Sequence, residues 1–265
     1  MRSAFPTLEG KQSVSATKDF FFEMDDAKRA KWIKSRFGVD VDPENDPVLW
    51  EQLSAEYTDM IEAAAEEAEY RWLERHSHNE FFYEFSAELT TASSLLTLGQ
   101  DSQQALTVYK LVYAHAVTLL EALIGSVVRT LVISEPDLMM NVAKGYEEAN
   151  KKKYTLKEIA SQPKGIESIV FKLLSGLSFH NTATIRTVLE AMFGQHMAGL
   201  ELDEIARICE KRHDIIHRNG RTIDDAPIQL DAAEVGQAIV TIRDFAADLK
   251  TRIYAALVEI EEQIF

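Results

Sequence analysis

The sequence is poor in cysteine and in strand-forming patterns. Its 265 residues include one cysteine, Cys209, which excludes an intramolecular disulfide and a cysteine-rich zinc module and favours a reducing compartment. The first residues lack the continuous apolar segment of a secretory signal. No stretch longer than a few residues alternates in hydropathy as a strand does, and no internal repeat is present. We therefore expect an all-α protein in the cytoplasm.

Positive charge is also scarce. Lys and Arg number 28 against 43 Asp and Glu, so the formal net charge is -15. A chain this acidic lacks the broad basic surface that non-specific nucleic-acid binding requires, and any contact with RNA has to be local. The sign reverses in residues 210–221, "EKRHDIIHRNGR", where four cations and two histidines stand against two acids.

One apolar run, residues 111–133, is long enough to cross a bilayer. It carries Glu121 near its middle, and a charge there costs about 2.5–3.5 kcal/mol on insertion scales. We therefore expect a helix buried in a protein core and no membrane partner.

Hydrophobic periodicity and turn residues predict the order of the helices. The expected helical ranges are 17–38, 50–76, a continuation through 81–99, 103–133, 137–150, 164–176, 182–193, 203–218 and 231–264. Residues 1–99 are expected to form an accessory helical segment that could engage a regulatory protein partner. Residues 100–265 are expected to form a helical bundle around the helix at 103–133.

The charged cluster falls on the helix at 203–218, with Asp203 expected as N-cap and Asn219-Gly220 as its end. At about 100° per residue, five apolar residues share one stripe and Arg212 lies in its middle. These five are Ile205, Ile208, Cys209, Ile215 and Ile216. A guanidinium on an apolar stripe needs a partner, and His213 and His217 flank the same stripe.

Two interpretations of this cluster need no reaction on RNA. Arg212 can pair inside the fold with the histidines as ordinary interface residues. Alternatively, "HDIIH" has the i, i+4 histidine spacing of zinc metalloproteases. However, Asp214 is a methylene shorter than the usual glutamate, no third ligand follows, and Arg212 would repel a cation. We therefore expect neither a metal nor another cofactor.

The stretch "RHDIIHRNG" resembles the signature of the HEPN domains, an all-α family with a metal-independent ribonuclease site. The order of "LLEALIG", "TLKEI", "LSFHN", this motif and a final long helix is similar to bacterial members, over about residues 100–260. The resemblance implies a HEPN-like bundle with an N-terminal helical extension. It also implies that Arg212, His213 and His217 are the catalytic positions.

Metal-free cleavage of RNA needs proton transfer and a cation at the phosphate. Histidine titrates near neutral pH and arginine binds phosphate oxygens, so His217 is the expected proton-transfer residue and Arg212 the phosphate clamp. His213 would orient or assist. We further expect phosphate contacts from Lys211, Arg218, Asn219 and Arg221. Glu121 on the central helix could support the site by pairing with Arg212, or pair with Arg129 instead.

Arg212 and His217 lie about 140° apart on a regular helix. Either the helix distorts near Asn219-Gly220, or two copies meet to form one site. The resemblance favours the second, since HEPN nucleases build a composite cleft between protomers, and it implies a homodimer.

The sequence therefore predicts an endoribonuclease that leaves a 2′,3′-cyclic phosphate. The resemblance suggests a setting in stress response, toxin action or phage defence. Asn219 stands where related toxins carry a tyrosine that is modified, so silencing through that tyrosine is not expected. The rival hypothesis is a non-catalytic HEPN-like module that binds a protein, nucleotide or RNA.

Overall fold

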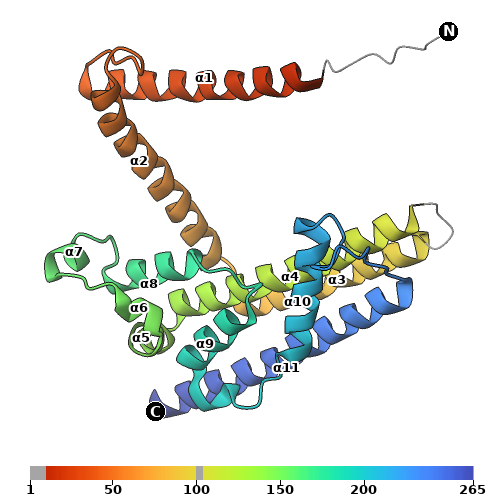
Figure 1. Cartoon of the computed structure of the whole chain (residues 1–265). Helices are drawn as coiled ribbons and strands as arrows, with labels where there is room; N and C mark the ends of the chain where they lie inside the picture. The colour runs from red at the N-terminus through yellow and green to blue at the C-terminus, as the bar shows by residue number, and fades with distance from the viewer. Residues whose placement is uncertain (1–9, 100–103, 265) are drawn as a thin grey trace, which may run out of the picture. The chain divides into compact units, whose positions relative to one another are not determined.

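The chain folds into helices, which confirms the expected all-α class. The computed structural model describes residues 10–99 and 104–264 and contains no strand within them (Figure 1). An isolated antiparallel bridge joins Arg221 to Pro227. The helices are α1 Gly10–Phe37, α2 Pro47–Glu74, α3 His78–Gly99, α4 Ala105–Ser134, α5 Pro136–Gly145, α6 Glu147–Lys151, α7 Leu156–Ala160, α8 Ile166–Ser175, α9 Thr182–Phe193, the 3₁₀ helix η1 Gly194–Met197, α10 Asp203–His217 and α11 Ala232–Ile264.

The chain divides into two compact units, Met1–Tyr70 and Arg71–Phe265. The boundary expected at residue 99 is therefore displaced, because α3 packs along α4 and against α11 and so belongs to the second unit. An amphipathic helix belongs to the unit whose helices cover its apolar face, and the sequence of α3 does not indicate which helices those are.

The first unit has a small core. Ile33, Val41 and Leu53 are buried, and Trp32 and Trp50 pack against them. Gly38 ends α1 with a φ of 72°, as expected for a glycine that stops a helix. In the following turn, the side chain of Asp42 accepts the backbone N–H groups of Glu44 and Asn45 at 2.8 and 3.1 Å.

The second unit is organised around α4, which confirms its predicted central position. Helices α3, α5, α8, α10 and α11 all pack against it (Figure 1). Among the described helices, α4 alone is long and apolar enough to cross a membrane, and 61% of that apolar window is buried inside the protein. Leu111 is an exception to the buried stripe, since it is 65% exposed.

Several helix boundaries differ from the expected ones, beginning with α1, which starts at Gly10 and not at residue 17. The range predicted as one helix at 137–150 is two helices, α5 and α6, separated by Tyr146 in an extended conformation. The helix expected to continue from α2 into α3 is interrupted before Ser77, whose backbone N–H donates to the carboxylate of Glu80 at 2.6 Å. Helix α7 lies in a range for which the sequence predicts only a connector, and Thr155 and Glu158 cap it reciprocally.

Candidate active site

Helix α10 carries the charged cluster and lies across α4 in the second unit (Figure 1). Its inner face buries Ile205, Ile208, Cys209 and Ile215, as the stripe predicted. Ile216 was assigned to the same stripe, but its side chain is 49% exposed. The N-cap of α10 is Leu202, and no side chain caps this end of the helix. Asp203, the expected N-cap, is the first helical residue.

The C-terminus of α10 turns sharply directly after His217. Arg218 leaves helical geometry, and Asn219 and Gly220 follow with φ values of 53° and 74°. The Gly220 N–H donates to the carbonyls of Asp214 and Ile215 at 3.2 and 3.1 Å, which closes the helix end as predicted. The helix is regular up to His217, so no distortion turns Arg212 and His217 toward one point within a single chain.

His213 and His217 form a pair on the outer surface of α10. Their ring centroids are 4.7 Å apart with an interplanar angle of 41°. Both residues are exposed, so both imidazoles are open to a ligand. The predicted i, i+4 proximity of these two candidates is therefore confirmed.

Arg212 lies on the buried side of the same helix turn. Its residue is half-buried, and its Nε is buried with no hydrogen-bond partner among the described residues. A guanidinium nitrogen without a hydrogen bond in this position costs free energy, and such groups concentrate at functional sites. The sequence placed this residue correctly, but the partner that it was expected to need is missing within the described chain.

The charges of Arg212 and of Glu121 on the central helix both act on Cys209. Burial, together with the negative charge of Glu121, raises the pKa of the Cys209 thiol to about 11, and the positive charge of Arg212 partly opposes this. The thiol is therefore a neutral, buried group at physiological pH and is a poor nucleophile. Its surroundings also place Glu121 and Arg212 in one electrostatic neighbourhood.

Glu121 contacts the segment before α9. Its Oε1 is 3.7 Å from Nδ1 of His180, and it is buried without a hydrogen bond among the described residues. His180 in turn has Nδ1 2.6 Å from the hydroxyl of Ser178. No ion pair joins Glu121 to Arg212 within the described residues, so the direct pairing considered from sequence is not found.

The other predicted phosphate-binding cations are engaged in ion pairs. Lys211 pairs with Glu234 of α11, and Arg218 pairs with Asp214 one turn earlier. Arg221 donates to the backbone oxygen of Asp225 at 2.7 Å and lies 3.3 Å from its carboxylate. Asn219, the remaining candidate, is exposed in the turn. The exposed pairs of Lys211 and Arg221 contribute about 0–1 kcal/mol, so phosphate could compete for these two cations at little cost, whereas the Arg218–Asp214 pair is partly buried.

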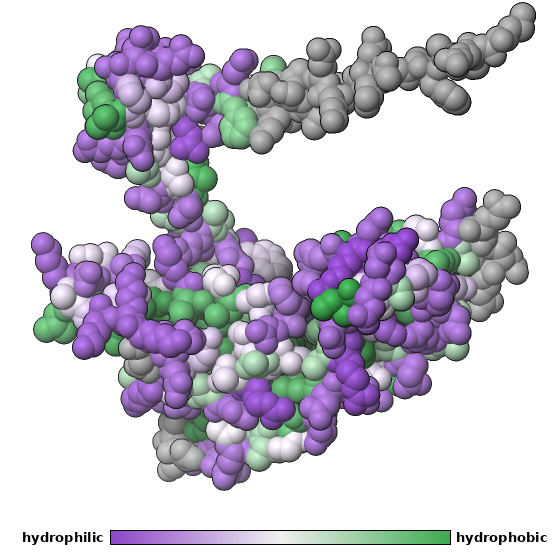
Figure 2. Space-filling model, in the orientation of Figure 1, coloured by the Kyte–Doolittle hydropathy of each residue, from purple (hydrophilic) through white to green (hydrophobic). Residues whose placement is uncertain are grey.

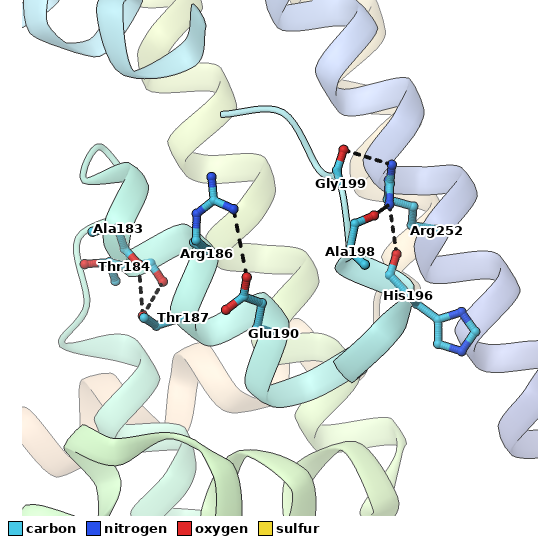
Figure 3. Close-up of polar contacts among 9 residues, drawn as sticks. All are labelled: Ala183, Thr184, Arg186, Thr187, Glu190, His196, Ala198, Gly199 and Arg252. Carbon is cyan, nitrogen blue, oxygen red and sulfur yellow. Dashed lines mark hydrogen bonds and ion pairs between the residues drawn. The ribbon is translucent and has the colours of Figure 1, made fainter. Parts of the chain in front are cut away.

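Arg252 of α11 is hydrogen-bonded to residues 194–202, the segment that connects α9 to α10. The guanidinium of Arg252 donates to the carbonyl oxygens of His196, Ala198 and Gly199 at 3.1, 2.7 and 3.4 Å (Figure 3). His196 also contacts Glu259 through Nε2 at 2.8 Å. These long-range contacts fix the start of α10 relative to α11.

Helix α9, just before this connection, carries its own local contacts. Thr187 donates to the carbonyl of Ala183 at 3.0 Å, and Arg186 pairs with Glu190 at 3.9 Å (Figure 3). Asn181 caps the helix by accepting the N–H of Ala183 at 2.9 Å. Its neighbour His180 does not cap the helix and reaches Glu121 instead.

Two contributors to this region were not named from the sequence. Lys110 of α4 lies over Gly220, so closely that a Cβ there would approach its Cε to 2.9 Å. Arg252 lies on α11, 40 residues after Arg212. No local pattern identifies either residue, because both act through packing between helices that are distant in sequence.

No group of three or more His, Cys, Asp or Glu side chains with metal-binding geometry occurs in the part of the chain that the structure describes. Comparisons with protein-family models, with curated proteins and with solved structures give no match for this chain.

Proposed function

We propose that this protein is a metal-independent endoribonuclease whose site is built on the C-terminal half of α10. The observation that carries the proposal is the exposed His213–His217 pair, with ring centroids 4.7 Å apart, on the same stretch of helix as Arg212, whose Nε has no hydrogen bond among the described residues. Paired imidazoles supply proton transfer at neutral pH, and guanidinium binds phosphate oxygens. The resemblance of "RHDIIHRNG" to the HEPN signature supports the same assignment.

In the proposed reaction, the ribose 2′-hydroxyl of RNA attacks the adjacent phosphate. His217 transfers the proton, with His213 beside it to orient or share that proton. Arg212 stabilises the negative charge that develops on the non-bridging oxygens. The P–O5′ bond breaks, leaving a 2′,3′-cyclic phosphate on one fragment and a 5′-hydroxyl on the other. The reaction requires neither a metal nor a cofactor.

The proposed active form is a homodimer. The regularity of α10 up to His217 supports this, because Arg212 lies on the inner face while both histidines face outward. A second copy could bring its own histidine pair to a partner's arginine. The exposed side chain of Ile216, between the two sets, gives the helix an apolar contact for such an interface.

The test is cleavage of end-labelled RNA in excess EDTA by the wild type and by Arg212→Ala, His213→Ala and His217→Ala. We expect the wild type to produce cyclic-phosphate ends, and Arg212→Ala and His217→Ala to lose about 100-fold or more in kcat/KM. His115→Ala is a matched control, because this histidine is exposed on α4 outside the cluster. Cleavage that EDTA abolishes would reject the metal-free mechanism.

A second candidate function is a non-catalytic helical module that binds a protein, nucleotide or RNA. It is favoured by the net charge of -15 and by the ion pairs that occupy Lys211, Arg218 and Arg221. In this case no RNA would be cut, and His217→Ala would change assembly or stability instead. Sedimentation and unfolding measurements on the same variants separate the two candidates.

A further inference from the structure

A second cationic segment lies far from α10 in the sequence. Residues 151–164, which we call the lysine segment, contain five lysines and one acid, Glu158. The lysine segment connects α6 to α8 and includes α7. In a chain with a net charge of -15, this is a strong local reversal of sign.

Two of the three acids in residues 147–164 already have partners, and the third, Glu147 of α6, acts on Lys151 through its charge. Glu158 accepts the backbone N–H and the hydroxyl of Thr155 at 2.7 and 2.8 Å, so its carboxylate serves the helix cap. Glu148 pairs with Lys151. Lys152, Lys153 and Lys157 are exposed, and the structure gives them no ion pair within the residues it describes.

Aromatic and apolar groups lie among these lysines. The Nζ of Lys152 is 5.0 Å from the ring centroid of Tyr154, and Leu156 is 86% exposed. Figure 2 shows a hydrophilic surface around α6 and α7 that a small hydrophobic patch interrupts. Ammonium groups beside aromatic and apolar side chains bind single-stranded nucleic acid, through phosphate attraction and base contacts.

The lysine segment differs from α10 in how much of its charge is available. Lys211 of α10, and Arg218 and Arg221 in the turn that follows it, are each paired with an acid. Three lysines of the segment have no such pair within the described residues. An anionic membrane is a poorer fit, because α7 has five residues and lacks the extended apolar face of an interfacial helix.

We propose that the lysine segment is an RNA-docking surface, which captures the phosphate backbone of single-stranded RNA while the α10 site cleaves it. This inference rests on the proposed ribonuclease function. Figure 1 places α7 at one end of the second unit and α10 across the middle of α4, so a bound strand would run along the unit between them.

The test measures binding separately from cleavage. The probe is a fluorescent 2′-O-methyl oligonucleotide of about 20 nucleotides, which lacks the attacking hydroxyl and cannot be cut, and its anisotropy is followed at several salt concentrations. The triple variant Lys152→Gln, Lys153→Gln, Lys157→Gln should bind about tenfold more weakly at low salt. The slope of log K against log salt should fall by about 2, since each lost phosphate contact removes about 0.7.

The matched control is Lys28→Gln, Lys31→Gln, Lys34→Gln on α1, which removes the same charge from exposed positions. It should keep both the affinity and the slope of the wild type. Equal binding by the wild type and the segment variant, or an equal loss in the control, would overturn the proposal. A wild type that binds phosphatidylserine vesicles and not the oligonucleotide would overturn it as well.

Failure of the ribonuclease proposal gives a different result. In that case the wild type binds the 2′-O-methyl probe through the lysine segment but leaves unmodified RNA intact. If both proposals hold, the segment variant cuts RNA with a raised KM and an unchanged kcat.

Discussion

At the residue scale, Gly220 shows how a single position terminates the candidate catalytic helix. Its φ of 74° lies in the left-handed region, which only glycine occupies at little cost. The side chain of Lys110 fills the space where a Cβ would be. The backbone turn that follows His217 therefore depends on this residue.

Replacing Gly220 with alanine should lower the free energy of unfolding by about 1–2 kcal/mol, through the left-handed strain. Gly236 is the matched control, because it lies within α11 and a Cβ added there would meet open space. Gly236→Ala should raise stability by up to about 1 kcal/mol, through helix propensity alone. Urea unfolding midpoints compare the two, and equal shifts would reject the argument.

The buried thiol of Cys209 leads us to predict how the free energy of unfolding changes at alkaline pH. Burial raises the pKa of its thiol from 9.0 to about 11, and burial likewise raises the pKa of Tyr113. In each case the folded state binds the proton more tightly than the unfolded state does. The contribution of the protonated Cys209 thiol to the stability of the folded state is therefore fully present below pH 9.0, and it is lost as the pH rises toward 11.

For Cys209 the loss amounts to about 2–3 kcal/mol across that window. Unfolding free energies measured from pH 8 to pH 11 should fall for the wild type and fall less steeply for Cys209→Ala. A wild type whose stability does not change over this range would contradict the assigned burial of the thiol.

At the scale of elements, the start of α10 depends on a contact from α11. Arg252 holds three carbonyls of the connection before α10, and its Nε lies 2.8 Å from the carboxylate of Asp248. Removing a side chain that satisfies several backbone acceptors leaves those acceptors without their donor. The connection and the first turn of α10 should then open more easily.

Arg252→Ala should cost about 1–3 kcal/mol in global stability and speed amide hydrogen exchange in residues 194–205. Arg243→Ala on the same helix removes an exposed arginine and should change neither quantity measurably. Exchange rates that rise equally in the two variants would show that the carbonyl contacts do not order this connection.

The helix starts that were not predicted did carry a signal in the sequence. Helix α7 begins with Thr155 and Glu158, and α3 begins after Ser77 with Glu80 at the third helical position. Both are capping-box patterns, which would have marked these two helix starts. The break at Tyr146 has no comparable pattern, since it separates two helices through one extended residue.

At the scale of the whole molecule, the candidate site raises the question of assembly. Arg212 and His217 lie on opposite sides of a regular helix. If a complete site takes its arginine from one protomer and its histidines from the other, two different inactive variants can complement each other.

Mixing Arg212→Ala with His217→Ala under conditions of subunit exchange should therefore restore activity. Half of the dimers would be mixed, with one intact site of two, so recovery should approach about a quarter of the wild-type rate. Mixing Arg212→Ala with wild type at matched concentration controls for dilution. A monomer with full activity, or a mixture that stays inactive while dimers exchange, would rule out the shared site.

The sequence alone determined the helical class, the central position of α4, the extent of α10 and the adjacency of His213 and His217. These follow from periodicity, helix caps and the i, i+4 spacing, all of which act within one element. The tertiary structure decided that α3 joins the second unit, that Glu121 lies near His180, and that Arg252 contacts the connection before α10. It also decided that Lys211 pairs with Glu234 of α11, while Arg212 and three lysines of the lysine segment have no ion pair within the described residues. Local patterns could not predict these contacts, because each one depends on which distant helix packs against the residue concerned.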